Sequence, residues 1–301
     1  MVDRGRILGC VRLLTCVAGL AALLALGAAG TASASRIKPT AVVPSVARLV
    51  PADDRGRTFV SPENATYYPD EFVAGNGHTI EGMDPEMLDA LAKIMGIKVT
   101  LTNVPFDDII PGIVRGKYQL SMSSIDDTTK RETQISLVDY AHAGQRFVTY
   151  AGSGVSLRNM GDMCGLAVAV QYGTTELSYV SEKSTECLVA GSKPVTVVPF
   201  ANQTLVDNAL RRHRVKLALA DTPVADSLTR ASHGKLVLVG PETAIAPFGV
   251  AVPKGSRLLP ALRAGMRYLQ AHGYYTAILK RWGLESIAIP ASKMVVNGAG
   301  G

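Results

Sequence analysis

The stretch SSIDDTTKRE at 123–132 has side chains that could bind a small charged molecule. It holds two serines, two threonines, a lysine, an arginine and three acids, with one apolar residue among them. Arg131 offers a planar fork of donors that matches a carboxylate, and Ser124 adds a hydroxyl and a backbone amide. The preceding residues predict a strand at 118–124, so these groups stand near a strand end, where open α/β sheets bind ligands.

The elements around this stretch alternate between strand and helix, which predicts an α/β fold. β-Branched residues and apolar alternation predict strands at 58–60, 98–104, 118–124, 166–171, 195–200, 215–221, 235–240 and 248–255. Apolar residues at helical spacing, with glycine or proline at several ends, predict helices at 84–96, 106–116, 172–180, 202–213, 222–231, 258–272 and 274–282.

Two further strand ends carry polar groups. Thr174 and Thr175 follow the strand at 166–171 and open a helix, whose unpaired amides and partial positive charge favour an anion. Asp221 ends the strand at 215–221, directly before another helix. Each of the three could instead serve only as a helix cap. The sequence therefore leaves both a binding and a capping role open for them.

The composition bounds the class of protein. The 301 residues are 47% hydrophobic and 19% charged, enough for one large core or two smaller ones. The net charge is +6, but the basic residues are scattered. We read their densest run, RRHR at 211–214, as an exposed helix end, so no nucleic-acid partner is expected.

The N-terminus has the three parts of an export signal. Three arginines precede the apolar run at 13–30, and the small residues ASA follow at 32–34. We therefore interpret 1–34 as a signal peptide cleaved after Ala34, and expect an exported protein, periplasmic or extracellular. A retained membrane anchor and a lipid-modified cysteine remain alternatives.

Removal of the signal peptide leaves two cysteines, Cys164 and Cys187. An even pair in an oxidising compartment predicts a disulfide, with two buried free thiols as the alternative. Neither has the spacing of a metal site, and the five histidines are dispersed, so no metal and no cofactor is expected. At the ends of the chain, we expect a poorly ordered linker at 35–57, where prolines recur without a sustained period, and a tail at 288–301 with a frayed end.

Five segments in order give the chain a resemblance to the family 3 extracellular solute-binding proteins, the polar amino-acid receptors of ABC importers. They are YYPDEF…G…IEGMDPEML, FDDIIPGIVRGKYQLSMSS with RE six residues later, VAVQYGTT, LADTPVA, and FGVAVPKGSRL…GYYTAILKRWG. Together they span about residues 60–285. The resemblance implies the type II periplasmic-binding-protein fold, two lobes with a ligand cleft.

The same resemblance places the parts of that fold on this chain. Lobe 1 would comprise 58–149 and 245–287, and lobe 2 would comprise 152–242. Two crossover strands, near 147–153 and 241–247, would form a hinge that closes the lobes on the ligand. The resemblance also implies an ABC transporter permease as partner, and we expect a monomer.

The resemblance further assigns roles in the cleft. Ser124, Arg131 and Thr175 would hold the ligand's α-carboxylate, with Thr174 beside them, and Asp221 would take its α-ammonium. Tyr67 would stack over the ligand and Phe106 would form the facing wall, although either could be ordinary core.

Two positions depart from the family pattern. Asn64 stands where several relatives carry an aspartate that reads the ligand's side chain, which argues against a lysine or arginine ligand. Asp126 stands where relatives have serine or threonine beside the ligand's carboxylate. It would cost affinity unless it turns away, pairs with Lys130 or Arg131, or meets a cationic ligand group.

The leading hypothesis is a binding protein for a polar amino acid or related small zwitterion that feeds an ABC importer, and not an enzyme. An enzyme on the same fold, resembling cyclohexadienyl dehydratases, would need a carboxylic acid in the cleft, for which Asp126 is the candidate. A sensor or partner-binding module that does not transport is the third hypothesis.

Overall fold

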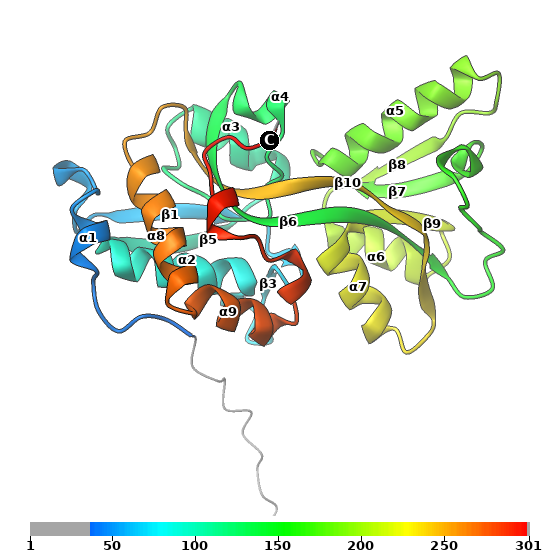
Figure 1. Cartoon of the computed structure of the whole chain (residues 1–301). Helices are drawn as coiled ribbons and strands as arrows, with labels where there is room; N and C mark the ends of the chain where they lie inside the picture. The colour runs from blue at the N-terminus through cyan, green and yellow to red at the C-terminus, as the bar shows by residue number, and fades with distance from the viewer. Residues whose placement is uncertain (1–36, 300–301) are drawn as a thin grey trace, which may run out of the picture. The chain divides into compact units, whose positions relative to one another are not determined.

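Two long antiparallel strands, β6 (Ile135–Tyr150) and β10 (Leu236–Pro253), run between two groups of helices in the computed structural model (Figure 1). The structure describes residues 37–299, so the predicted signal peptide lies outside the described residues. The strands predicted at 235–240 and 248–255 are the two ends of β10. Each long strand belongs to both lobes, which confirms the predicted two-lobe α/β fold.

Lobe 1 contains a parallel pair of strands, a small antiparallel sheet and most of the helices. Its strands are β1 (Thr58–Glu63), β2 (Thr66–Tyr67), β3 (Glu71–Val73), β4 (Ile80–Glu81) and β5 (Lys98–Asn103). Its α-helices are α1 (Pro44–Ala47), α2 (Met83–Met95), α3 (Ile109–Val114), α4 (Thr129–Glu132), α8 (Leu259–Ala271) and α9 (Tyr274–Trp282). Its 3-10 turns are η1 (Ala52–Asp54), η2 (Phe106–Asp108), η4 (Glu285–Ile287) and η5 (Ala291–Lys293).

Lobe 2 is a sheet with helices packed against it. It contains β7 (Ala167–Gln171), β8 (Thr196–Phe200), β9 (Leu217–Asp221), α5 (Thr175–Val189), α6 (Gln203–Arg211), α7 (Thr222–Ala231) and η3 (Met160–Met163). The sheet has the order β10-β6-β9-β7-β8, and β7 runs parallel to both β8 and β9. β7 and β9 therefore end at the same edge, which brings Thr174, Thr175 and Asp221 together.

Helix α2 shows why the sequence pattern folds as it does. Its apolar residues at 87, 88, 91, 94 and 95 are all buried, because their spacing places them on one stripe of the helix. Each buried side chain of this size stabilises the fold by about 1.5–3 kcal/mol. The helix ends at Gly96, whose φ of +72° is the left-handed conformation that glycine adopts without strain.

Strand β6 passes from the lobe 1 core to the lobe 2 core at an earlier residue than predicted. Ala143 belongs to the lobe 1 core, whereas Phe147 already packs in lobe 2, so the crossing lies between them and not at 147–153. The register against β10 breaks between Val239 and Ala246, within the second predicted crossover. At Gly144 a Cβ atom would lie 2.4 Å from Glu242 Cγ, so a larger residue at this crossing would require the Glu242 side chain to move.

The segment at 37–57, predicted as a poorly ordered linker, is part of lobe 1. Pro44 begins the short helix α1, a position where its missing amide costs nothing. Val46 and Val50 are buried in the lobe 1 core, and the amide of Val43 donates to Ile94 O at 3.0 Å. Pro44 and Pro51, whose recurrence in the sequence predicts a linker, stand at the starts of α1 and η1.

The C-terminal tail, whose end was expected to fray, is hydrogen-bonded to lobe 1 as far as residue 299. Asn297 Oδ1 accepts from the amide of Leu137 at 2.9 Å, and the amide of Asn297 donates back to Leu137 O at 3.0 Å. The Gly298 amide donates to Asp127 Oδ2 at 2.8 Å. Residues 118–124 do not form the predicted strand. Within them, Ser121 makes an isolated bridge with Ala251.

The predicted disulfide between Cys164 and Cys187 is present and joins the end of η3 to α5. It closes a loop with a sequence separation of 23 residues. Such a loop stabilises a fold by roughly 3 kcal/mol in the chain-entropy model. Within residues 37–299, no helix is both long enough and apolar enough to cross a membrane.

The tail covers a pair of acids whose protonation makes stability depend on pH. Burial, followed by the charge of Asp127, raises the pKa of Asp139 to about 8, and burial raises that of Asp127 to about 6. Both exceed the unfolded value of about 3.9, so the folded state holds extra protons and loses stability as pH rises. We expect the free energy of unfolding to fall between pH 5 and pH 8, and to fall less in Asp139→Asn.

Urea unfolding at the two pH values measures this difference. Glu182→Gln, which neutralises an exposed acid on α5, is the matched control and should keep the full decrease. An equal decrease in Asp139→Asn and in the unchanged protein would show that the buried pair does not set the pH dependence.

Candidate functional site

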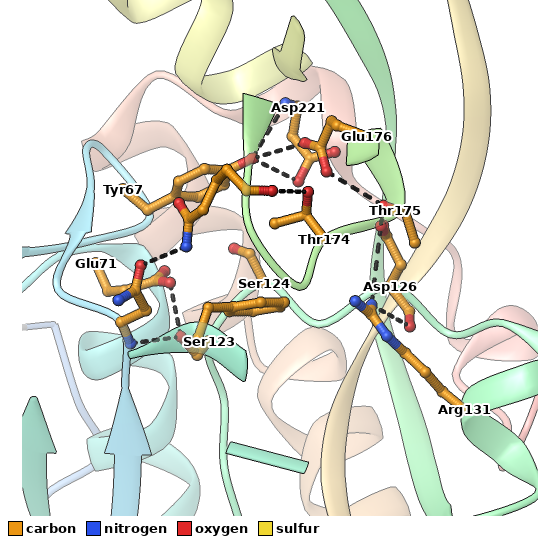
Figure 2. Close-up of a pocket in the computed structure, with 13 residues that line it drawn as sticks. Tyr67, Glu71, Ser123, Ser124, Asp126, Arg131, Thr174, Thr175, Glu176 and Asp221 are labelled. Atoms are coloured by element: carbon orange, nitrogen blue, oxygen red, sulfur yellow. Dashed lines mark hydrogen bonds and ion pairs between the residues drawn. The ribbon is translucent and has the colours of Figure 1, made fainter. Parts of the chain in front are cut away.

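A cavity lies where the ends of β7 and β9 meet lobe 1 (Figure 2). All nine residues predicted for the site line it. They are Asn64, Tyr67, Phe106, Ser124, Asp126, Arg131, Thr174, Thr175 and Asp221. The remaining lining residues, which the sequence reading missed, are Glu71, Ser123, Gln171 and Glu176.

Arg131 reaches the cavity from the short helix α4. Thr128 accepts the Arg131 amide at 3.2 Å and so caps α4. The guanidinium lies over the Phe106 ring, 5.5 Å from its centroid, and Nη1 donates to the backbone oxygen of Asp126 at 2.9 Å. Arg131 is only 8% exposed, so its charge needs a partner in the cleft.

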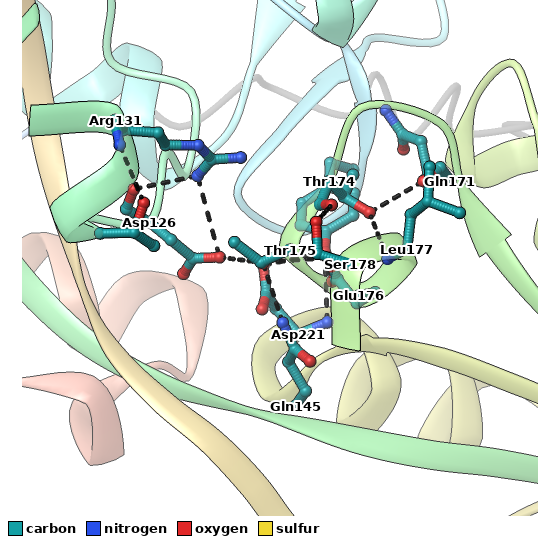
Figure 3. A network of polar contacts seen from close by, with 12 residues as sticks. Asp126, Arg131, Gln145, Gln171, Thr174, Thr175, Glu176, Leu177, Ser178 and Asp221 are labelled. Carbon is teal, nitrogen blue, oxygen red and sulfur yellow. Dashed lines mark hydrogen bonds and ion pairs between the residues drawn. The ribbon is translucent and has the colours of Figure 1, made fainter. Parts of the chain in front are cut away.

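The carboxylate of Asp126 supplies part of that pairing. Asp126 Oδ2 lies 3.9 Å from Arg131 Nη1 and accepts a short hydrogen bond from Thr175 Oγ1 (Figure 3). Of the partners predicted for Asp126, the structure thus shows Arg131. Burial is the main cause that raises the pKa of Asp126 to about 7, and the guanidinium opposes this shift.

The two threonines at the start of α5 have different roles. Thr174 Oγ1 accepts from the Leu177 amide at 3.3 Å and donates to Gln171 O at 2.8 Å, so Thr174 caps the helix. Thr175 Oγ1 accepts from Gln145 Nε2 at 2.9 Å and directs its own hydrogen to Asp126. The capping alternative therefore describes Thr174 but not Thr175.

Ser124 does not present the two donors expected of it. Its amide and its hydroxyl both donate to Asp84 Oδ2, at 2.6 and 3.1 Å, in a backbone with φ of +43°. Tyr140 donates to the same oxygen at 2.9 Å. The donors of Ser124 thus bind a buried carboxylate of the fold and are not available to a ligand.

Tyr67, Asp221 and Glu176 form the opposite end of the cavity. The Tyr67 hydroxyl lies 2.9 Å from Asp221 Oδ2 and 3.1 Å from Glu176 Oε1, and it accepts from the Asp221 amide at 3.1 Å. Asp221 Oδ1 is buried without a hydrogen-bond partner. Burial, then the charges of Glu176 and Asp126, raise the pKa of Asp221 well above its usual value.

Glu71 adds a further buried acid on the lobe 1 side. Its Oε1 accepts from Ser123 Oγ at 2.7 Å, whereas Oε2 is buried without a partner. Nearby, Asn64 Oδ1 accepts from Gln171 Nε2 and Asn64 Nδ2 donates to Val104 O, both at 2.9 Å. The amide of Asn64 is thus engaged within the protein, and Glu71 is the acid at this end. Burial, then the charges of Asp84, Asp70 and Glu63, raise the pKa of Glu71 well above its usual value.

The charges of the cavity are unequal. Four carboxylates, from Glu71, Asp126, Glu176 and Asp221, face one guanidinium, a formal charge of −3 if all ionise. Each of the four is at most 4% exposed. Buried like charges repel one another and favour a cation that would pair with them. Within the described part of the chain, no three of these acids, nor other ligating side chains, are grouped to hold a metal ion.

Two of the missed residues had a signal in the sequence. Glu176 directly follows the threonine pair at a helix start, and Glu71 lies inside the YYPDEF segment. An acid in a first helical turn is also a common stabilising feature, so its position alone did not identify a binding group.

The comparisons with known proteins agree with this architecture. The family model of the bacterial extracellular solute-binding proteins, family 3, matches residues 63–285. The arginine-binding protein ArgT of Corynebacterium glutamicum is 29% identical over 81% of this chain and 80% of its own. The ABC transporter arginine-binding protein 1 of Escherichia coli is 26% identical, over 73% and 88% respectively.

A solved structure also resembles this chain. An ancestral arginine-binding protein bound to arginine superposes with a TM-score of 0.69 at 29% identity, covering 76% of this chain and 99% of its own. The matched region contains most of both lobes and every residue that lines the cavity. The chain belongs to the bacterial extracellular solute-binding proteins of family 3.

Proposed function

We propose that this protein captures a cationic amino acid, with arginine as the first candidate, and delivers it to an ABC importer. The excess of buried carboxylates in the cavity carries the proposal. The names of the relatives support it, since those matched above are arginine-binding proteins. This reverses the expectation drawn from Asn64, because Glu71 and Glu176 supply the negative charge that an amide lacks.

Each end of a cationic amino acid has a complementary group in the proposal. Arg131 and Thr175 receive the α-carboxylate, through a charge-assisted pair that is stronger than a neutral hydrogen bond. Asp221 and Glu176 receive the α-ammonium. Glu71, on the lobe 1 side of the cavity, receives the cationic end of the side chain. Tyr67 and Phe106 provide apolar surface between these groups.

The surrounding fold fits capture and release. Polar contacts between the lobes, such as Gln171 Nε2 to Asn64 Oδ1, hold the cleft closed around the cavity. Among the described strands, only β6 and β10 run through both lobes, so we take them as the hinge. We further propose that the protein is exported, acts as a monomer and presents its closed form to a permease.

A dehydratase activity receives no such support from the site. The acid it would require, Asp126, is directed at Thr175 and Arg131. The relatives matched above are named as binding proteins.

A thermal-shift panel tests the proposed ligand class. A ligand at 1,000 times its Kd stabilises the folded state by about 4.1 kcal/mol, which raises Tm by several degrees. We expect arginine, lysine or ornithine to raise Tm most, with glutamine smaller and glutamate without effect. A larger shift with glutamate or glutamine than with any cation would overturn the proposal.

A further inference from the structure

The side chain of Asp126 contacts Thr175 and Arg131, the two residues that are proposed to bind the ligand's α-carboxylate. Its Oδ2 accepts the Thr175 hydroxyl hydrogen and lies 3.9 Å from Arg131 Nη1, in a site where Asp126 is 4% exposed (Figures 2 and 3). The position is fixed by the backbone, since Asp126 bridges Phe248 and its carbonyl accepts from Arg131 at 2.9 Å. The protein thus carries an internal counterpart of a ligand carboxylate.

This arrangement lowers the free-energy penalty for binding a ligand that has no carboxylate. In a clamp whose only anion comes from the ligand, loss of the ligand's carboxylate leaves a buried guanidinium unpaired. Truncating one partner of a buried charge pair typically weakens binding thirtyfold or more. Here Arg131 and Thr175 keep Asp126 as partner when the ligand has no carboxylate.

A ligand that has a carboxylate must compete with Asp126 for the same groups. Its carboxylate must displace Asp126 from Thr175, or share the clamp with a second anion. The charged groups that act on Asp126 are Arg131, which favours its ionised form, and Glu176 and Asp127, which oppose it. Two anions on one guanidinium therefore compete, and the benefit of the ligand's α-carboxylate is reduced.

We propose that the cavity also binds carboxylate-free cations, the decarboxylated counterparts of basic amino acids, and that Asp126 is the residue that permits this. The inference rests on the proposed function, because it takes the cavity to be a site for cationic ligands. The remaining acids, Glu71, Glu176 and Asp221, suit a molecule with a cationic group at each end and no anion.

Arginine and agmatine test the inference, because they differ by one carboxylate. Calorimetric titration of the unchanged protein should give Kd values for the two ligands within about tenfold of each other. Asp126→Asn keeps the shape but removes the competing charge, so it should bind arginine at least thirtyfold more tightly than agmatine. Glu182→Gln removes an exposed acid on α5, so its ratio of the two Kd values should equal that of the unchanged protein.

The outcomes separate this inference from the proposed function. A thirtyfold or greater preference for arginine in both the unchanged protein and Asp126→Asn would overturn the inference and leave the proposed function standing. Binding of agmatine without arginine would support the inference and overturn the proposed function, and binding of neither cation would overturn both. Asp126→Thr, checked by circular dichroism, replaces the asparagine variant if that one does not fold.

Discussion

Arg131→Ala is expected to weaken arginine binding by tenfold to several hundredfold. Hydrogen bonds to charged groups contribute about 1.5–3 kcal/mol each, and the guanidinium is the only cation among the residues that line the cavity. The variant also leaves Asp126 without its cationic partner, which adds repulsion toward the ligand's carboxylate. Isothermal titration of the purified variant with arginine measures the loss.

Two variants serve as controls for this prediction. Lys130→Ala removes an exposed cation from the same helix and should leave the affinity unchanged. Arg131→Lys keeps the charge but not the planar fork, so it should recover only part of the loss. If Arg131→Ala binds arginine as the unchanged protein does, Arg131 does not hold the ligand.

Asp221→Asn is expected to weaken arginine binding at least tenfold. Asparagine keeps the size of the side chain and an oxygen that can accept from Tyr67, but it removes the charge proposed to pair with the α-ammonium. Because the pKa of Asp221 is raised, part of the pairing energy is spent on releasing a proton. The loss should therefore be greater at pH 8 than at pH 6, where less of the carboxyl is ionised.

Asp226→Asn is the matched control, because it changes the same residue type on the adjoining helix α7 outside the cavity. It should bind arginine as the unchanged protein does. Equal affinities for Asp221→Asn and Asp226→Asn would remove Asp221 from the proposed ammonium site.

The local patterns predicted the elements that position the site. Helix α2 and strands β7 and β9 have regular apolar spacing, so periodicity located them, and polar residues at their ends identified the edge of the sheet. The segments at 37–57 and 288–299 have no such period. Their order comes from docking on the lobe 1 core and on β6, which no local pattern records.

The sequence located nine residues that line one cavity, but it predicted their contacts only in part. All nine predicted residues line one cavity, because family motifs and strand ends both pointed to them. The donors of Ser124 were misassigned, since their acceptor, Asp84, is 40 residues away in sequence. The charge balance was misjudged for a similar reason, because Glu71 and Glu176 look like ordinary surface acids until the fold buries them.

Titration with arginine and with citrulline tests the central claim most directly, that buried carboxylates select a cationic amino acid. Citrulline has nearly the shape of arginine and the same α-groups, but its side chain is neutral. Arginine is expected to bind at least thirtyfold more tightly than citrulline, because citrulline would leave Glu71 without a cationic partner. Equal affinity for the two, or tighter binding of citrulline, would contradict it.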